Sequence, residues 1–285
     1  MTAWPVDYAG DHTIAAEVEL HGVGLHSGAP CRLRLLPSTR PGYRLGWLDQ
    51  PAAQAQPLSP AQVCDTTLCT SLQLGDRRLA TVEHLLAALA GTGVTRVEIR
   101  VEGPEVPLLD GSALPWVEAI ASVGLQALPS QATRPELRQP VTVHDGAGFV
   151  TALPAADLQL GAAIEFAEPA IGRQVFSLAL TPASFVAEIA PARTFGLRSQ
   201  VVQLRAAGLI QGGALDNALV CDGAQWLNPP LRYGDEPVRH KILDLLGDLA
   251  LVGLPRAQVF AFRGSHRLHT ALAAALAAEH APLPA

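Results

Sequence analysis

The sequence lacks several features that would assign it to a membrane, a nucleic acid or a secretory route. Hydrophobic residues make up 49% of the chain, yet no uncharged apolar run reaches the roughly 18 residues that a membrane span needs. The net charge is −6, and no cluster of lysine and arginine indicates a nucleic-acid surface. Residues 1–17 carry Asp7 and Asp11 where a signal peptide has basic residues and an apolar block. We therefore expect a cytoplasmic protein with no membrane span and no nucleic-acid partner.

The chain also has few cysteines, none of them in a closely spaced pair, and almost no lysine. The chain has four cysteines and no Cys-x-x-Cys pair, which argues against a zinc ribbon and a dithiol redox site. Buried free thiols are the simpler interpretation of these residues, which are Cys31, Cys64, Cys69 and Cys221. Lys241 is the only lysine. Its side chain could bind an anionic substrate or extend into water, and spacing does not decide between these two.

The length and the order of the expected elements favour two domains. A chain of 285 residues can bury a large core, and segment 129–140, with its three prolines, is the best linker. We expect a first domain over residues 1–128 and a second over residues 136–285. A helix at 81–91, with Thr81 as its N-cap, precedes a strand at 94–101, and a helix at 239–251 precedes a strand at 258–263. This weak repeat predicts an α+β fold of two similar two-layer sandwiches, packed face to face.

The helix expected from residue 239 has an unusual polar stripe. Ile242, Leu243 and the leucines that follow form an apolar body, but His240, Asp244 and Asp248 recur every four residues on one face. Burying such carboxylates costs several kcal/mol each unless they are paired or bind a metal. A solvated stripe on an amphipathic helix is the alternative interpretation, because polar pairs at this spacing are common.

The helix expected at 81–91 is apolar except for Glu83 and His84 in its first turn. A glutamate at that place also favours the helix dipole, and a lone histidine on an apolar helix is usually a satisfied core residue. If the two halves pack face to face, however, His84 would meet His240 and Asp244. Two imidazoles and one carboxylate with an open fourth position are typical of a catalytic zinc site.

Four more residues would complete a hydrolytic site around such a metal. Glu83 would lie beside the activated water and could take its proton. His266, in a Gly-Ser-His turn, could protonate a leaving amine, with Asp248 holding its imidazolium, unless this turn merely lies at the surface. Thr194 could donate a hydrogen bond to a developing oxyanion.

Five segments, in this order along residues 13–275, resemble the UDP-3-O-acyl-N-acetylglucosamine deacetylase family. They are Thr-Val-Glu-His-Leu-Leu-Ala-Ala-Leu, Pro-Glu-Val-Pro-Leu-Leu-Asp-Gly-Ser-Ala, Ala-Arg-Thr-Phe-Gly, Arg-His-Lys-Ile-Leu-Asp-Leu-Leu-Gly-Asp-Leu and Gly-Ser-His-Arg-Leu. The resemblance implies two α+β sandwiches with the active site between them. It also implies zinc-dependent release of acetate from the UDP-sugar, the committed step of lipid A synthesis.

The resemblance implies a role for each matching residue. The zinc ligands would be His84, His240 and Asp244. The catalytic residues would be Glu83 as general base, His266 as general acid or electrostatic partner, Asp248 as its orienting carboxylate, and Thr194 at the oxyanion. Substrate-binding residues would be Phe166 against the uracil ring, Lys241 on the UDP side, and Phe195 and Gly213. The last two lie in an insert near residues 193–228 that forms a passage for the acyl chain.

The sequence departs from the family pattern near His266. His269 stands where many relatives have asparagine, and Ser265 stands between the glycine and the histidine. These changes concern the loop around His266 and leave the metal and base positions intact. Two alternative functions are another zinc amidohydrolase of the same architecture and an inactive module that still binds a UDP-sugar. No pattern signals oligomerisation, so we expect a monomer.

Overall fold

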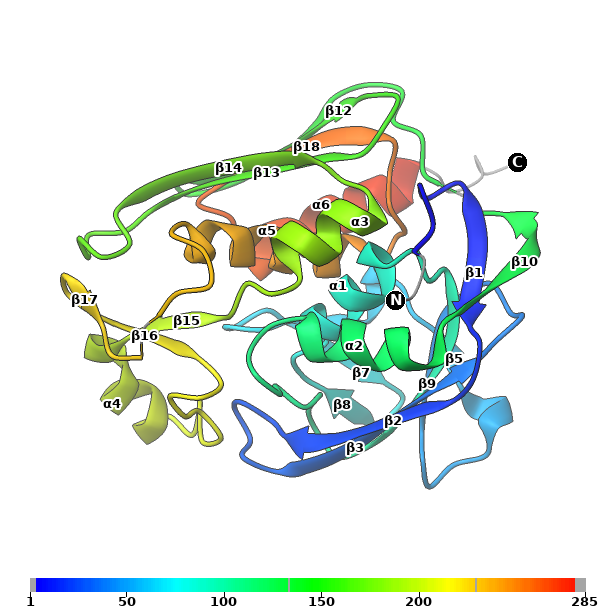
Figure 1. Cartoon of the computed structure of the whole chain (residues 1–285), viewed down its shortest axis with the longest axis horizontal. Coiled ribbons are helices and arrows are strands. Elements are labelled where there is room, and N and C mark those ends of the chain that lie inside the picture. The colour runs from blue at the N-terminus through cyan, green and yellow to red at the C-terminus, as the bar shows by residue number, and fades with distance from the viewer. Residues whose placement is uncertain (1–3, 133, 229, 280–285) are drawn as a thin grey trace.

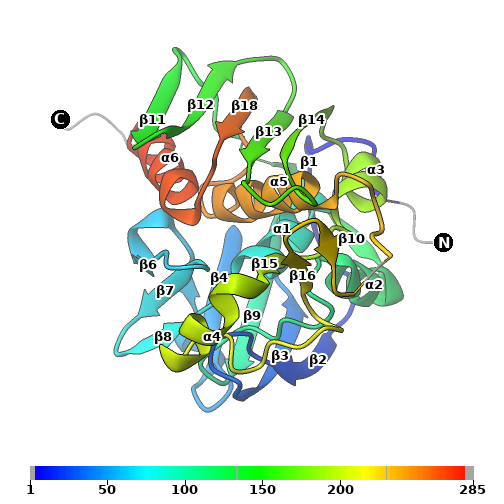
Figure 2. The ribbon, with the colours of Figure 1, turned by 90° about the vertical axis from the view of Figure 1, so that its left-hand side faces the viewer.

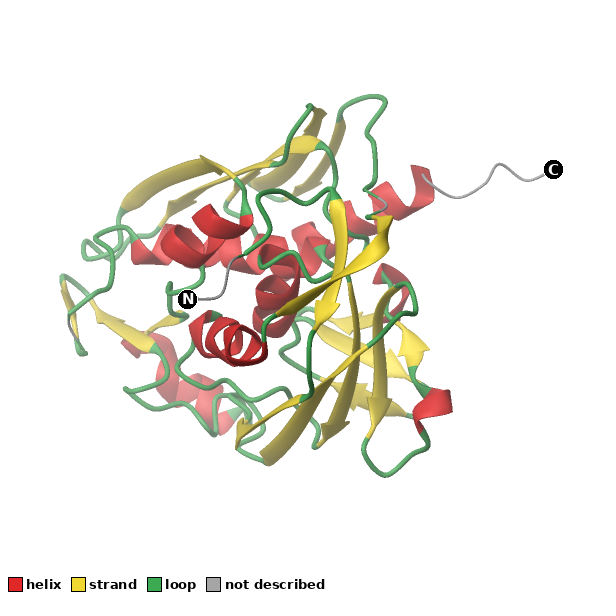
Figure 3. Cartoon of the chain, turned by 45° about the vertical axis from the view of Figure 1, so that its right-hand side comes forward, coloured by secondary structure: helices red, strands yellow, loops and turns green. Residues whose placement is uncertain are grey.

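Two five-stranded sheets enclose a double layer of helices in the computed structural model, which describes residues 4–132, 134–228 and 230–279. Figure 1 shows one sheet above the helices and the other below them. Figure 3, coloured by secondary structure, shows the red helices between the two yellow sheets. Each sheet therefore has one face on the helical layer, and the α+β class predicted from the sequence is confirmed.

The lower sheet has the strand order β2-β3-β9-β4-β5. Its strands are β2 (Val18–Val23), β3 (Pro30–Pro37), β9 (Arg96–Glu102), β4 (Gly42–Trp47) and β5 (Gln56–Pro57). All pairs are antiparallel except β4 with β9. Alternation sets the inner face, since Cys31, Leu33 and Leu35 of β3 are buried, whereas Arg32 between them is exposed and Arg34 is half-buried.

The upper sheet repeats that topology with the order β11-β12-β18-β13-β14. Its strands are β11 (Val141–Asp145), β12 (Gly148–Pro154), β18 (Ala257–Phe262), β13 (Gln159–Glu165) and β14 (Arg173–Ala179). Here too the last strand of the unit occupies the centre and pairs in parallel with one neighbour, β13. The internal repeat predicted from two helix–strand units is thus present in the sheets.

The helical layer contains α1 (Glu83–Gly91), α2 (Leu114–Val123), α5 (Glu236–Leu249) and α6 (His266–Glu279). Helices α1 and α5 pack directly on each other, and Gly247 allows their close approach. A Cβ atom at Gly247 would lie 2.1 Å from the backbone oxygen of Glu83. This contact places the first turn of α1 beside the polar stripe of α5.

A smaller unit projects to one side of the helices, as Figure 2 shows in front. It contains β15 (Phe195–Leu197), α4 (Arg198–Ala206), β16 (Leu219–Asp222) and β17 (Gln225–Trp226), which lie within the expected insert. The sequence from Gly212–Gly213 to Cys221 predicts a strand, but only its last part forms one, since β16 begins at Leu219. Gly212 instead packs against the turn after β2, where a Cβ would lie 2.2 Å from the backbone oxygen of Gly24.

The remaining elements connect these layers. They are β1 (Gly10–Ile14), β6 (Val63–Asp65), β7 (Ser71–Leu74), β8 (Arg77–Leu79), β10 (Leu125–Gln131), α3 (Pro182–Ser184), the 3-10 turns Ala52–Gln54 and Pro60–Gln62, and the π turn Phe185–Ile189. Strand β10 pairs with β1 and extends beyond residue 128, into the segment expected to be a linker. The division at residues 128 and 136 stays a prediction. Within the described ranges, no helix has the length and apolar character needed to cross a membrane.

The start of α1 differs from the prediction. The N-cap is Val82 and not Thr81. The φ of Thr81 is 58°, which lies in the left-handed region. The Thr81 hydroxyl donates a hydrogen bond to Glu105 Oε1 at 2.7 Å. The hydroxyl therefore contacts this buried carboxylate instead of the backbone N–H groups at the start of α1. This tertiary contact outweighs the local capping preference.

Candidate active site

The first turn of α1 and the polar stripe of α5 meet in the middle of the molecule. His84 Nε2 lies 3.8 Å from Asp244 Oδ1, and His240 Nε2 lies 3.3 Å from the same oxygen. The His84 and His240 rings stand edge to face with centroids 5.0 Å apart. All three side chains are buried. The stripe on α5 is therefore not a solvated face.

These three side chains fit a metal site. Their ligand atoms all lie within 4.8 Å of one another. Ligands held tetrahedrally at about 2.0 Å from a zinc ion are ~3.3 Å apart, which is close to the separations present here. His240 Nδ1 lies 3.0 Å from the Ala192 carbonyl oxygen, and donation to that oxygen leaves the Nε2 lone pair free. A metal ion could therefore be held by His84, His240 and Asp244.

Charge and burial prepare this set to bind a cation. Burial lowers the pKa of His84 to about 3, and His240 adds to this effect, so the ring is neutral at pH 7. Burial also lowers the pKa of His240. Burial alone would raise the pKa of Asp244, but Lys241 and the histidines hold it well below its usual range. Two neutral imidazoles and an ionised carboxylate are the protonation states that metal ligands need.

Glu83 lies next to the three residues that could hold a metal ion, and it is almost fully buried. Its Oε2 accepts the Thr70 backbone N–H at 3.0 Å, and its Oε1 lies 3.7 Å from His266 Nε2. Burial raises the pKa of Glu83 to about 8. A cation held by the neighbouring ligands would lower this pKa and keep the carboxylate ionised.

His266 begins α6 and is held by Asp248 of α5. Its Nδ1 lies 2.9 Å from Asp248 Oδ2. Burial lowers the pKa of His266, but the charges of Asp248 and Glu83, with the Asp248 hydrogen bond and a smaller contribution from Asp244, together outweigh this effect and raise the pKa to about 9. The opposite Asp248 oxygen accepts the Thr70 hydroxyl at 2.5 Å. The imidazole is therefore protonated at neutral pH and faces Glu83 through Nε2.

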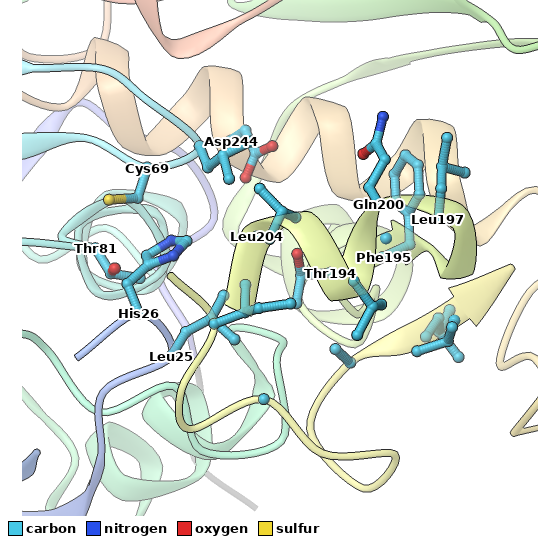
Figure 4. Close-up of a pocket in the computed structure, with 18 of the residues that line it drawn as sticks. Leu25, His26, Cys69, Thr81, Thr194, Phe195, Leu197, Gln200, Leu204 and Asp244 are labelled. Atoms are coloured by element: carbon cyan, nitrogen blue, oxygen red, sulfur yellow. The ribbon is translucent and has the colours of Figure 1, made fainter. Parts of the chain in front are cut away.

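A cavity of about 620 Å³ opens onto these groups. Glu83, His84, Asp244 and His266 line its polar end. Figure 4 shows Leu204 and Leu25 projecting into the cavity, with Asp244 at its edge. The rest of the wall is largely apolar and comes from the small unit around α4, with Val201, Leu204, Ile210, Leu215, Leu219 and Leu227. The shape suits a substrate with a polar reactive group and a long apolar arm.

The predicted oxyanion and substrate residues lie around this cavity. Thr194 lines it, and its backbone N–H is fixed by the Gly111 oxygen at 2.7 Å. In Figure 4 the Thr194 hydroxyl points into the pocket. Phe195 and Gly213 also line the cavity. Phe166 does not line it directly, but its ring packs on Phe195 with centroids 5.5 Å apart.

Lys241 also lines the cavity, and its ammonium lies 2.8 Å from Asp244 Oδ2. Its Nζ is 5.6 Å from the centre of the Phe195 ring. Lys241 thus contacts the ligand set and the cavity together, instead of extending into water.

The sequence assigned no role to three polar side chains of the site, which are Thr70, His26 and His269. Thr70 holds both Glu83 and Asp248, from a segment with no catalytic pattern. His26 lines the cavity, and neither of its ring nitrogens has a partner among the described residues. His26 lies in a glycine-rich segment, residues 21–28, and such a composition is typical of a turn and carries no catalytic signal. His269 donates to Asp248, and its only signal in the sequence was the departure from asparagine.

A buried His/His/Asp set beside a glutamate and a charged histidine is typical of metal-dependent amide hydrolases. Comparison with known proteins specifies the class further. The family model described as UDP-3-O-acyl N-acetylglycosamine deacetylase (LpxC) matches residues 11–278. The chain therefore belongs to the UDP-3-O-acyl-N-acetylglucosamine deacetylase family.

Individual relatives agree with the family model. A UDP-3-O-acyl-N-acetylglucosamine deacetylase of Thermosynechococcus vestitus is 50% identical over 280 residues, which cover 96% of each chain. One from a Nostoc species is 48% identical over 269 residues, covering 92% of this chain and 96% of its own. One from an Anaeromyxobacter species is 40% identical over 267 residues, covering 93% of this chain and 88% of its own.

Proposed function

We propose that this chain hydrolyses the N-acetyl group of UDP-3-O-acyl-N-acetylglucosamine, giving acetate and UDP-3-O-acyl-glucosamine, in the committed step of lipid A biosynthesis. One observation carries the proposal beyond family membership. A proton acceptor, Glu83, and a proton donor, His266, flank a possible metal site at the polar end of a large apolar cavity. Amide hydrolysis needs these two groups, and a fatty acyl chain needs such a cavity.

The metal in this proposal is zinc, held by His84, His240 and Asp244. Nitrogen and carboxylate ligands in a set of three, with the next position open to the cavity, suit a catalytic zinc ion. Zinc bound there would supply Lewis-acid activation of the attacking water and of the amide carbonyl.

The residues of the chain carry the proton transfers. Glu83 takes the proton of the attacking water, because it lines the polar end of the cavity and its carboxylate lies 3.7 Å from His266. His266, kept protonated by Asp248, gives a proton to the leaving amine. Thr194 donates its hydroxyl to the oxygen that becomes negative as the carbonyl is attacked.

The remaining residues orient the substrate. We assign the UDP side to Lys241 and the aromatic pair Phe166 and Phe195, where a cation and two rings lie together. The acyl chain would occupy the apolar part of the cavity, past Gly213 and the inner face of α4. Burying its methylene groups would stabilise the complex by about 0.8 kcal/mol each.

We further propose a monomer that works in the cytoplasm. The four cysteines, all within the described ranges, are free thiols, which suits a reducing compartment. Light scattering at assay concentration tests the monomer, and fractionation of cells tests the compartment.

The test of the function is release of acetate from UDP-3-O-acyl-N-acetylglucosamine by purified protein. We expect turnover with this substrate and a kcat lower by at least about 10²-fold with the Glu83→Gln variant, prepared in parallel to exclude a contaminating enzyme. UDP-N-acetylglucosamine without the acyl chain is the substrate control and should react far more slowly. Tight binding of the acylated substrate without acetate release would favour the inactive UDP-sugar-binding module. Equal turnover of both substrates would favour another zinc amidohydrolase.

A further inference from the structure

Asp248 has three hydrogen-bond donors, and two of them share one oxygen. Oδ1 accepts the Thr70 hydroxyl, whereas Oδ2 lies 2.9 Å from His266 Nδ1 and 3.1 Å from His269 Nδ1. The two histidines are three residues apart in the first turn of α6, and their rings stand edge to face with centroids 6.2 Å apart. His269 is therefore attached to the carboxylate that orients the proton donor, although it does not itself reach Glu83.

His269 is held in one orientation by its surroundings. The side chain is 1% exposed, and its Nε2 has no hydrogen-bond partner in the described part of the chain. That nitrogen faces the Gly264 backbone, because a Cβ at Gly264 would lie 2.5 Å from it. A ring with an unpartnered, buried Nε2 is most stable as the neutral form with its proton on Nδ1. In that form its single N–H points to Asp248.

We propose that His269 is a positioning residue for deacetylation, which fixes Asp248 Oδ2 as a second donor and thereby holds His266 Nε2 toward Glu83. This inference rests on the proposed function, since it assigns His266 as the proton donor. The Gly264 backbone packs on the His269 ring, so His269 also fixes the turn that leads into His266. The His269 side chain thus orients His266 in two ways. It acts on the His266 ring through the Asp248 carboxylate, and on the His266 backbone through the turn at Gly264.

The shared oxygen also has an electrostatic consequence. Each donor on Oδ2 stabilises the negative charge of Asp248, and so the N–H of His269 reduces the attraction that Asp248 exerts on the His266 proton. Removing this donor should raise the pKa of His266. Other titratable groups that act on His266 are unaffected by the change; they are Glu83 and His84 of α1, His240 and Asp244 of α5, and His26.

Two substitutions with side chains of similar size distinguish the effect of the His269 N–H donor from the effect of its packing. In His269→Asn, an amide N–H can replace Nδ1–H at the same distance from the main chain, whereas His269→Leu has no donor. We expect kcat of His269→Leu to fall by on the order of tenfold or more, with KM and bound zinc near wild type. The basic limb of its kcat/KM profile should move to higher pH. His269→Asn should stay within about threefold of wild type, and Arg267→Gln on the exposed side of α6 is the surface control.

Nitrogen-15 NMR of the zinc-loaded wild type, assigned by comparison with His269→Asn, provides a readout that does not depend on turnover. We expect the His269 ring to be neutral with its proton on Nδ1, and the pKa of His266 to rise in His269→Leu but not in His269→Asn. Equal kcat and equal His266 titration in the two variants, or a charged His269 ring, would overturn the proposal. If the wild type released no acetate, the proposed function would fail, and the His266 titration would still decide whether His269 controls that residue.

Discussion

His266 Nε2 lies 3.7 Å from Glu83 Oε1, although the two residues come from helices that begin 183 residues apart, at residues 83 and 266. The packing of α1 on α5, and the contact of α6 with Asp248, create this pair. Asp248 holds His266 through Nδ1, which leaves Nε2 facing Glu83 and available for proton transfer. In the proposed function this pair transfers the protons, and the three proposed metal ligands line the same site.

Substitution of a proposed metal ligand and substitution of the proposed general base should have different effects on bound zinc. His240→Ala removes one of three ligands, so we expect the purified variant to lose its zinc and its activity. Glu83→Gln keeps the ligands and the shape, so it should retain about one zinc per chain and lose at least 10²-fold in kcat. Metal analysis beside acetate release checks both variants. Near-wild-type turnover of Glu83→Gln would contradict the assignment of the base.

The pH dependence of activity should report the pKa of His266. Asp248, with Glu83 and Asp244, raises this pKa to about 9 against the effect of burial, so kcat/KM should fall as the pH rises through that region and His266 loses its proton. In Asp248→Asn the charge is gone, and the pKa of His266 should drop. The basic limb should therefore move to lower pH, opposite to the shift expected for His269→Leu. A limb that stays in place in Asp248→Asn would show that another group controls it.

The close contact of α1 and α5 should not tolerate a methyl group. In Gly247→Ala the new Cβ would lie 2.1 Å from the Glu83 oxygen and 2.7 Å from its carbonyl carbon, and both atoms are backbone. The helices must then separate, which should cost about 1–3 kcal/mol of unfolding free energy and displace Glu83. Gly234→Ala is the matched control, since no atom lies within 4 Å of its Cβ position. Thermal unfolding and kcat of both variants provide the measurement, and equal behaviour would contradict the packing account.

The apolar part of the cavity should determine which acyl chains are accepted. Leu204 of α4 lines the cavity and projects into it in Figure 4. A larger ring in Leu204→Trp should fill this space, so kcat/KM should fall more for a long-chain substrate than for a short-chain one. Gln203→Ala, next to it on α4 but exposed and outside the cavity lining, should affect both chain lengths alike. A uniform loss in Leu204→Trp would place the acyl chain elsewhere.

Part of this site could be predicted because its signals are local. The spacing of His240, Asp244 and Asp248 follows from the helical period, and the adjacency of Glu83 and His84 follows from the chain itself. The meeting of the two halves was predicted from a weak repeat, and the shared strand order explains why that inference succeeded.

The remaining features depend on contacts between distant residues. Thr70 and Asp248 are 178 positions apart, and no local pattern connects them. Thr81 matches an N-cap by sequence, but Glu105 holds it in a left-handed conformation. Gly212 resembles the start of a strand, but its lack of a side chain serves a close approach to Gly24. In each case tertiary packing outweighs local preference.

The central claim is that one zinc ion, held by His84, His240 and Asp244, makes this chain a deacetylase. The most direct measurement is acetate release from UDP-3-O-acyl-N-acetylglucosamine as metal-free protein is titrated with zinc. We predict no activity before zinc is added and a linear rise that ends at about one zinc per chain. Full activity in metal-free protein with chelator present, or no activity at any zinc ratio, would contradict the account.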